Sequence, residues 1–232
     1  MNNKCEICGG KFNEIYSGAI RDGAYRGCKS HAIVYECTCC KVQRLREEDC
    51  IPEEFYETGQ YRELLEESLE NKNAVVEQDE MQHYTLQAFF PQSLRGANIL
   101  DVGCGAGSLL DMLKNVSSSQ IGIEPCGPYL ESLTKRGHKV YSSLSEAIED
   151  KKGMIDYGFS IQVIEHVKNP IEFLKEIRKL IKPGGRLLIS TPNRNDILMT
   201  LLKDQFSQFF YRTQHRWYFD ESSLSYCIEK GG

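Results

Sequence analysis

The stretch ILDVGCGAGSLL, residues 99–110, decides the fold of this 232-residue chain. It has the pattern of a buried strand, a glycine loop and the first turn of a helix. A doubly wound α/β sheet uses this arrangement to bring its backbone close to a nucleotide-like ligand. The dinucleotide fingerprint has the spacing G-x-G-x-x-G, but its third glycine would fall on Ser108 here. The glycines instead follow G-x-G-x-G, which favours a nucleotide-like ligand of another kind.

An acid ends the next apolar run, IGIE at residues 121–124. It lies about 20 residues after the loop, where a second parallel strand is expected to end. A carboxylate in that place accepts hydrogen bonds from the hydroxyls of a ribose. We therefore predict that Glu124 binds a ribose. The alternative is a surface acid that opens a turn before Pro125.

A third and a fourth motif follow in order. The segment MIDYGFSIQVIEHV, residues 154–167, has a nearly continuous apolar stretch, which suits a central strand buried on both faces. Its polar end, from Gln162 to His166, falls at the carboxyl edge of the sheet, where ligands bind in such folds. The segment LIKPGGRLLISTPN, residues 180–193, predicts a helix that ends at Pro183 and a glycine turn into the next strand.

These four ordered motifs cover residues 97–193 and resemble those of the class I methyltransferases that depend on S-adenosylmethionine (SAM). The glycine loop resembles motif I of that family, and the EHV ending at residues 165–167 resembles small-molecule O-methyltransferases. The resemblance implies a doubly wound, mainly parallel Rossmann-like sheet, with Asp101 near the methionine end of SAM and Glu124 on its ribose. The cofactor-binding residues expected in this core are Asp101, Gly103, Gly105, Gly107, Glu124 and Gln162.

Composition indicates a soluble globular protein with one good core and a small appendage. Hydrophobic residues make up 41% of the chain, and the mean hydropathy is −0.43. No apolar stretch approaches the length of a membrane span, and the N-terminus lacks the apolar region of a signal peptide. We therefore expect a cytoplasmic protein.

The net charge of −5 is unevenly distributed along the chain. Residues 1–50 carry 8 basic and 7 acidic side chains (+1), and residues 51–95 carry 3 and 10 (−7). Residues 96–232 carry 17 and 16, again giving +1. Nucleic-acid-binding proteins usually show a basic footprint, so we expect no nucleic-acid partner.

Seven of the ten cysteines lie in the first fifty residues, where two C-x-x-C pairs predict a metal site. Without a secretory signal, disulfides are disfavoured and a structural zinc ion is favoured, because four thiolates suit tetrahedral zinc. Cys39 competes with Cys40 as the fourth zinc ligand and Cys28 is a weaker candidate, whereas Cys50 is expected not to bind the ion. A set of buried reduced thiols is the alternative. The predicted ligands are Cys5, Cys8, Cys37 and Cys40.

Residues 52–90 combine many acids with apolar side chains at helical spacing, which predicts helices. Class I methyltransferases commonly lay N-terminal helices over the cofactor as a lid. The resemblance then implies that Arg62 meets the SAM carboxylate and that Tyr61 or His83 lines the pocket. A solvated pair of acidic helices is the alternative.

An aromatic segment, YRTQHRWYFD at residues 211–220, follows the last predicted strand and is expected to line the acceptor site. His166 and His215 are the two candidates for a catalytic base, since a hydroxyl acceptor gains from one. Each histidine could instead pad or cap the pocket. Arg212 and Arg216 could hold a phosphate or be merely solvated. The family normally continues into an antiparallel hairpin at the point where this sequence stops, so that hairpin is expected to be missing.

The sequence thus predicts three regions: a cysteine-rich zinc domain at 1–50, a helical lid or linker at 51–95, and a SAM-binding core at 96–232. A cysteine domain before such a core resembles the zinc-containing methyltransferases of sugar and surface-polysaccharide pathways. The expected function is therefore methyl transfer to a hydroxyl or carbon of a sugar, a nucleotide-activated sugar or a related polysaccharide precursor. The alternatives are an RNA base methyltransferase, or a SAM-binding or zinc scaffold without turnover.

Overall fold

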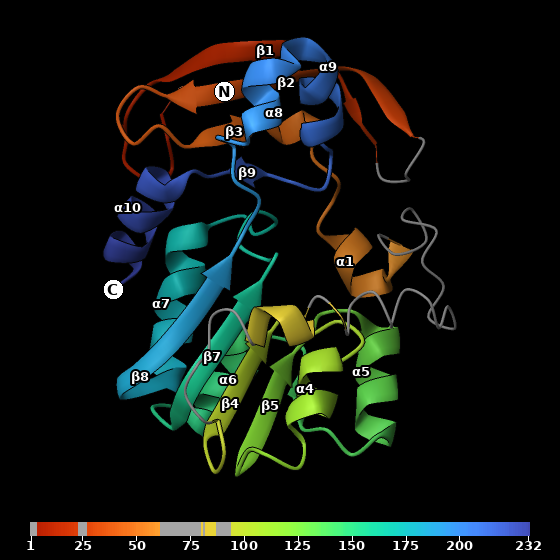
Figure 1. Cartoon of the computed structure of the whole chain (residues 1–232), viewed down its shortest axis with the longest axis vertical. Helices are drawn as coiled ribbons and strands as arrows, with labels where there is room; N and C mark the ends of the chain where they lie inside the picture. The colour runs from red at the N-terminus through yellow and green to blue at the C-terminus, as the bar shows by residue number, and fades with distance from the viewer. Residues whose placement is uncertain (1–3, 23–26, 61–79, 81, 87–93) are drawn as a thin grey trace. The chain divides into compact units, whose positions relative to one another are not determined.

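The computed structural model describes residues 4–22, 27–60, 80, 82–86 and 94–232. The chain forms two compact units, and each is built from separate stretches of sequence (Figure 1). The first unit contains Met1–Pro52, Gln162–Lys175 and Ser190–Gly232. The second contains Glu53–Ile161 and Glu176–Ile189. These units do not follow the linear division into residues 1–50, 51–95 and 96–232, which remains a prediction about independent domains.

The second unit contains the mainly parallel sheet that the sequence predicts, and this confirms the Rossmann-like α/β fold. Strand β4 lies between β5 and β7 and is parallel to both, and β6 is parallel to β5. The order across the sheet is β6-β5-β4-β7-β8. The strands are β4 (Asn98–Val102), β5 (Ser119–Ile123), β6 (Val140–Tyr141), β7 (Ile155–Ile161) and β8 (Ile181–Ser190).

Helices alternate with these strands, as a doubly wound sheet requires. Figure 1 shows α4 beside strand β5, with α5 on the far side of α4. One core cluster joins the central strands β4 and β7 to α4 through fully buried side chains such as Ile99 and Phe159. The helices are α1 (Glu54–Thr58), α4 (Ser108–Leu113), α5 (Gly127–Lys135), α6 (Leu144–Lys151) and α7 (Pro170–Leu180), the last of which extends from one unit into the other.

The fourth motif begins its strand earlier than the sequence suggests. Helix α7 ends at Leu180, and β8 already includes Pro183 and the two glycines after it. Gly184 has a φ of 77°, so the chain makes its glycine-dependent bend inside the strand instead of between helix and strand.

The first unit is built on a four-stranded sheet with the order β1-β2-β3-β9. Strands β1 and β2 form a long antiparallel hairpin, and β3 pairs with β2. The fourth strand comes from much later in the chain: Gln43 pairs with Tyr218 and Arg44 with Trp217 (Figure 1). The strands are β1 (Phe12–Arg21), β2 (Cys28–Cys37), β3 (Gln43–Leu45) and β9 (Trp217–Tyr218).

Three helices of the C-terminal segment complete the first unit: α8 (Ile197–Leu201), α9 (Lys203–Phe210) and α10 (Glu221–Gly231). A 3₁₀ helix at Glu47–Asp49 follows β3. Asp220 caps α10, because its Oδ1 accepts the Ser223 N–H at 2.8 Å while the Ser223 hydroxyl accepts the Asp220 N–H. Asp220 is therefore the N-cap residue of α10, and it forms a capping box with Ser223.

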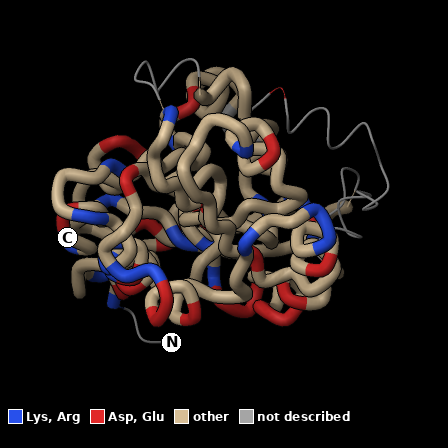
Figure 2. Tube along the Cα trace, turned by 90° about the horizontal axis from the view of Figure 1, so that it is seen from below, with Lys and Arg blue, Asp and Glu red and all other residues tan. Residues whose placement is uncertain are grey.

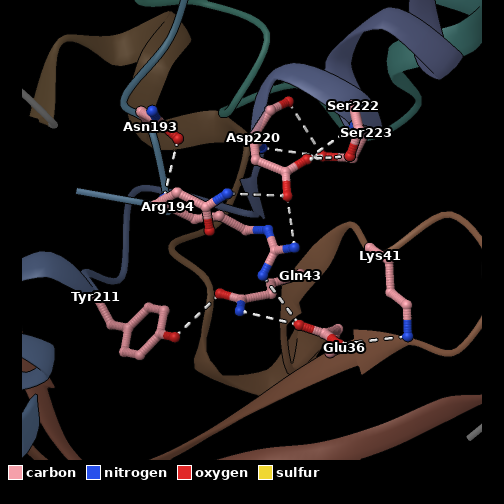
Figure 3. A network of polar contacts seen from close by, with 10 residues as sticks. Glu36, Lys41, Gln43, Asn193, Arg194, Tyr211, Asp220, Ser222 and Ser223 are labelled. Atoms are coloured by element: carbon pink, nitrogen blue, oxygen red, sulfur yellow. Dashed lines mark hydrogen bonds and ion pairs between the residues drawn. The ribbon is translucent and has the colours of Figure 1, made fainter. Parts of the chain in front are cut away.

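A polar network joins the start of this helix to the N-terminal sheet (Figure 3). The guanidinium of Arg194 donates to Glu36 of β2 at 2.9 Å and to Asp220 at 2.6 Å. Beside it, the Tyr211 hydroxyl donates to the Gln43 side chain at 3.0 Å. Side chains that lie far apart in the sequence therefore hold the first unit together.

Charged residues of both signs are interspersed along the described part of the Cα trace (Figure 2). Among the described residues, no helix combines the length and the apolar character needed to cross a membrane.

Candidate active site and cysteine cluster

The glycine loop connects β4 to α4, and three of its glycines have left-handed backbone angles. The φ values are 72° at Gly103, 52° at Gly105 and 87° at Gly107. A side chain is disfavoured at such angles. At Gly107 there is also no room, since an added Cβ would lie 2.3 Å from the Leu133 side chain of α5. The predicted loop therefore has the tight backbone that a closely bound ligand requires.

Glu124 follows β5 and reaches back to this loop. Its Oε2 accepts the Gly105 N–H at 2.8 Å, and its Oε1 accepts the Cys126 N–H at 3.0 Å. The residue is only 8% exposed, so it is a buried carboxylate and not a surface acid beside a turn. A carboxylate oxygen has more than one acceptor position, so these bonds leave capacity for further donors. This arrangement fits a ligand that carries a ribose diol.

Asp101 lies in β4 beneath the loop and is almost fully buried. Burial, with a smaller contribution from the charge of Glu124, raises the pKa of Asp101 to about 7. A cationic group bound nearby would favour the ionised form of this carboxyl. SAM carries both an ammonium and a sulfonium, so the pair of buried acids fits the cofactor that the resemblance implies.

The remaining predicted cofactor residues lie elsewhere. Gln162 is an exposed residue of the first unit with an unusual φ of 57°, and its N–H donates to the Ser190 carbonyl at 2.9 Å. Arg62 and Tyr61 lie outside the described residues. His83 is exposed. Non-glycine residues with a positive φ are concentrated at functional sites, so the backbone conformation of Gln162 is compatible with its predicted place in the cofactor site.

The two predicted catalytic histidines come together in the first unit. The rings of His166 and His215 are edge to face, with centroids 4.8 Å apart. Backbone pairing explains the approach, because the Glu165 carbonyl accepts the N–H groups of both Arg216 and Trp217. The Nδ1–H of His166 donates to the Gln214 carbonyl at 2.8 Å, and its Nε2 lies 3.9 Å from the Oε1 of Glu165.

Glu165 lies close to these histidines, although no sequence pattern predicted it as a site residue. One ligand atom from each of Glu165, His166 and His215 lies within 4.8 Å of the others. Glu165 is 0% exposed, and burial raises its pKa to about 7 despite the Thr191 hydroxyl and the charge of Arg212 nearby. Burial also lowers the pKa of His215 well below its ordinary value, so His215 is neutral.

The aromatic segment after α9 contributes its rings mainly to the core of the first unit. Tyr211 and Tyr218 are at most 2% exposed, and their ring centroids lie 4.9 Å apart in an edge-to-face contact. The buried guanidinium of Arg216 forms an ion pair with Glu47. Arg212 donates its N–H to the Tyr218 hydroxyl at 3.0 Å, and its charge acts on Glu165 and on His215.

The four predicted zinc ligands also lie together in the first unit. The sulfur atoms of Cys5, Cys8, Cys37 and Cys40 all lie within 4.8 Å of one another, with Cys5 and Cys40 3.7 Å apart and Cys8 and Cys37 3.3 Å apart. A tetrahedral ion with Zn–S bonds of about 2.3 Å places its sulfurs about 3.8 Å apart. The cluster therefore fits zinc in number, element and spacing.

The rival cysteines are placed differently. Cys39 and Cys28 are exposed, and none of Cys28, Cys39 and Cys50 belongs to the four-sulfur group. Within the group, the hydrogen bond from the Cys5 thiol lowers the pKa of Cys40 to about 5, while burial raises that of Cys37 to about 11. Buried thiolates need a compensating positive charge, which a metal ion supplies.

Comparison with known proteins identifies relatives of the chain. It is 36% identical over 110 residues to a ubiquinone biosynthesis O-methyltransferase from Dechloromonas aromatica, covering 44% of this chain and 47% of the relative. It is 30% identical over 154 residues to the mitochondrial ubiquinone biosynthesis O-methyltransferase of Homo sapiens, covering 60% and 42%. The chain spans less than half the length of these curated relatives.

Solved structures share the fold. A SAM-dependent methyltransferase from Archaeoglobus fulgidus matches with a TM-score of 0.55 at 19% identity, covering 75% of this chain and 73% of the other. Another from Thermotoga maritima gives a TM-score of 0.53 at 23% identity, covering 69% and 72%. These similarities support the methyltransferase architecture.

The expectation of a sugar acceptor is wrong, because the relatives are named as O-methyltransferases of ubiquinone biosynthesis. That expectation depended on the cysteine domain, which carries no information about the acceptor hydroxyl. The same names do not favour an RNA base or a scaffold without turnover. A family model described as a methyltransferase domain matches residues 77–232. This chain therefore belongs to the methyltransferase-domain family.

Proposed function

We propose that this protein methylates a phenolic hydroxyl of an aromatic quinone precursor, using SAM as the methyl donor. The observation that carries the proposal is the 36% identity to a protein named as a ubiquinone biosynthesis O-methyltransferase. The buried acids around the glycine loop support the choice of donor, since they suit a ligand with a ribose and cationic groups.

The reaction is an in-line displacement at the methyl carbon. The bond from the methyl carbon to sulfur breaks as the bond to the phenolic oxygen forms, giving an aryl methyl ether and S-adenosylhomocysteine. The phenol loses its proton to a base or to water. Orientation of the two reactants contributes most of what the protein supplies to such a step.

The cofactor is proposed to bind against the loop of Gly103, Gly105 and Gly107. Glu124 holds the ribose, and Asp101 lies toward the methionine end. Gln162 and Arg62 are further proposed contacts. His166 and His215 are the proposed groups at the acceptor end, where they handle the proton of the hydroxyl.

Zinc is proposed to bind the four-cysteine cluster in a structural role. All four tetrahedral positions are filled by sulfur, and a catalytic zinc site keeps one position open for substrate or water. The ion would stabilise the hairpin of β1 and β2, whose ends carry the ligands Cys37 and, by way of the adjoining loop, Cys8.

The experiment offers the protein methyl-labelled SAM together with 3,4-dihydroxybenzoate or a dihydroxybenzene that carries a short prenyl chain. We expect a labelled aryl methyl ether, identified by mass spectrometry, and no label on glucose or a nucleotide sugar. The matched control for substitutions of His166 or His215 is His31→Ala, which replaces an exposed histidine of β2 and should methylate as the wild type does. Binding of S-adenosylhomocysteine without methylation of any phenol would contradict the proposed acceptor.

A further inference from the structure

We infer that Arg136 is a positioning residue for the cofactor, because it holds the glycine loop at a second point beside the one held by Glu124. Glu124 accepts the Gly105 N–H at 2.8 Å, and the guanidinium of Arg136 donates to the carbonyl of Ala106, the next residue of the loop. All four residues belong to the second unit. The inference rests on the proposed use of SAM as the methyl donor, and it does not depend on the acceptor.

The composition of the loop makes such support necessary. Gly103, Gly105 and Gly107 all have a positive φ, and glycine loses more conformational freedom on ordering than any other residue. A ligand that binds a loosely ordered loop must supply the free energy that orders it, and this lowers the affinity. Contacts that fix the loop before the ligand arrives therefore raise the affinity for that ligand.

The peptide group between Ala106 and Gly107 is held at both of its polar atoms. Its N–H donates to the Cys104 carbonyl at 2.8 Å, and its carbonyl accepts from Nη2 of Arg136. The guanidinium also lies directly against the loop, since a Cβ added at Gly107 would be 3.0 Å from the same Nη2. This peptide group therefore cannot turn without breaking one of the two contacts.

Arg136 is itself oriented by residues around α4. Its Nη1 donates to Oδ2 of Asp111 in that helix, and the other oxygen of this carboxylate is hydrogen-bonded to Nε2 of His138 at 2.7 Å. The His138 side chain is buried, and Lys114 at the end of α4 donates to the Arg136 carbonyl at 2.8 Å. The guanidinium is thus connected through Asp111 to a buried ring, which limits its freedom although it is partly exposed.

The shape of the guanidinium suits this role better than that of another cation. Its two terminal nitrogens reach different partners at once, Asp111 on one side and the Ala106 carbonyl on the other. A lysine ammonium keeps the charge without this fixed fork. Because a partly exposed ion pair contributes little to overall stability, the loss of Arg136 should be measured in ligand binding more than in unfolding.

The test measures the binding of S-adenosylhomocysteine by isothermal titration calorimetry, with no acceptor present. We expect Arg136→Ala to lower the affinity about tenfold while the melting temperature falls by less than about 3 °C. Arg136→Lys should restore part of the affinity, because it keeps the charge and one donor. The matched control is Lys135→Ala, which removes the neighbouring cation and its exposed ion pair with Glu131 and should bind as the wild type does.

A second variant, Asp111→Asn, tests the same arrangement from α4. It removes the charge that orients Arg136, and we expect a smaller loss of affinity in the same direction. In the double variant, the loss should equal that of Arg136→Ala alone, because both residues act through one contact with the loop.

Three results would overturn the inference: equal affinity in the wild type and Arg136→Ala, additive losses in the double variant, or a loss that follows the melting temperature and is not restored by lysine. A wild type that does not bind S-adenosylhomocysteine would overturn it together with the proposed donor. Turnover is not measured, so the expected binding pattern in a protein that methylates no phenol would support the role of Arg136 and contradict only the proposed acceptor.

Discussion

Glu124 is the residue in which the local pattern and the observed contacts agree most closely. It was predicted from an apolar run that ends in an acid, and it accepts backbone N–H groups from the glycine loop and from Cys126. Such a residue shapes the loop as well as offering acceptors to a ligand. Its removal therefore affects binding in two ways.

We predict that Glu124→Ala lowers the affinity for S-adenosylhomocysteine at least tenfold, a loss of about 1.4 kcal/mol. The Gly105 N–H would lose its partner, and the ribose would lose its acceptor. Isothermal titration calorimetry measures the change. Glu131→Gln, which alters an exposed glutamate of α5, serves as the control and should bind normally. Equal affinity in both variants would remove Glu124 from the cofactor site.

Asp101 gives a pH prediction. Its folded-state pKa of about 7 lies above the unfolded value of about 4, so the folded protein holds more protons between these pH values. This group therefore makes the protein less stable as the pH rises from about 4 to 7. In Asp101→Asn that dependence should shrink, as judged by urea unfolding across the range. If Asp101→Asn has the same pH dependence of stability as the wild type, the pKa of Asp101 is not raised in the folded protein.

The surroundings of Glu165 could not be predicted from the sequence on either side of it. The glycine loop and Glu124 could be predicted because strand, loop and acid lie within one βαβ unit. The surroundings of Glu165 come instead from residues 212–217, about fifty positions later, which close over it through backbone pairing. Nothing in the EHV triplet alone indicates that its carboxylate is buried beside two histidines.

At the scale of elements, the C-terminal aromatic segment is where the structure differs most from the expectation based on the sequence. Aromatic rings after a strand end suggested a pocket, but Trp217 and Tyr218 form a strand of two residues, too short to show any periodicity. That strand lies at the edge of the N-terminal sheet, where Tyr218 joins the core of the first unit and Trp217 is fully buried. The helix that follows was predictable, because its cap is a local signal.

We predict that Asp220→Ala lowers the free energy of unfolding by about 1 to 2 kcal/mol. The change removes the cap of α10 and the ion pair with Arg194 that joins this helix to β2 (Figure 3). Urea unfolding followed by tryptophan fluorescence measures it. The comparison variant is Asp196→Ala, which removes the cap of the short helix α8, and we expect a smaller loss there. A loss as small as that of Asp196→Ala would contradict the role given to Asp220.

At the scale of the whole molecule, the first unit combines the cysteine cluster with the loop that carries His215. Strand β3 follows Cys40 closely and pairs with β9, and Trp217 of β9 donates its Nε1–H to the Val167 carbonyl at 2.9 Å. Sequence patterns predicted the cysteines and the histidines separately. They could not predict the antiparallel pairing that places both in one unit, because it joins residues far apart in the chain.

Removal of the proposed zinc should therefore be detected at Trp217, which is the single tryptophan of the chain. We predict that chelation, or Cys8→Ser, lowers the melting temperature and moves the emission of this buried indole to longer wavelength. Fluorescence during a thermal scan measures both effects. Cys39→Ser changes an exposed cysteine outside the cluster and should leave them unaltered. Unchanged emission in metal-free protein would show that loss of the ion from the cysteine cluster does not alter the surroundings of Trp217 in β9.

The late arrival of β9 has a consequence for synthesis on the ribosome. Residues 43–44 of β3 meet their partners at 217–218 only after about 170 further residues are made, roughly 10 to 30 s at ordinary translation rates. The four cysteine ligands have all emerged long before then. During that interval the nascent hairpin presents an unpaired edge and four thiols, so early capture of an ion would protect it from oxidation and from pairing with neighbouring chains.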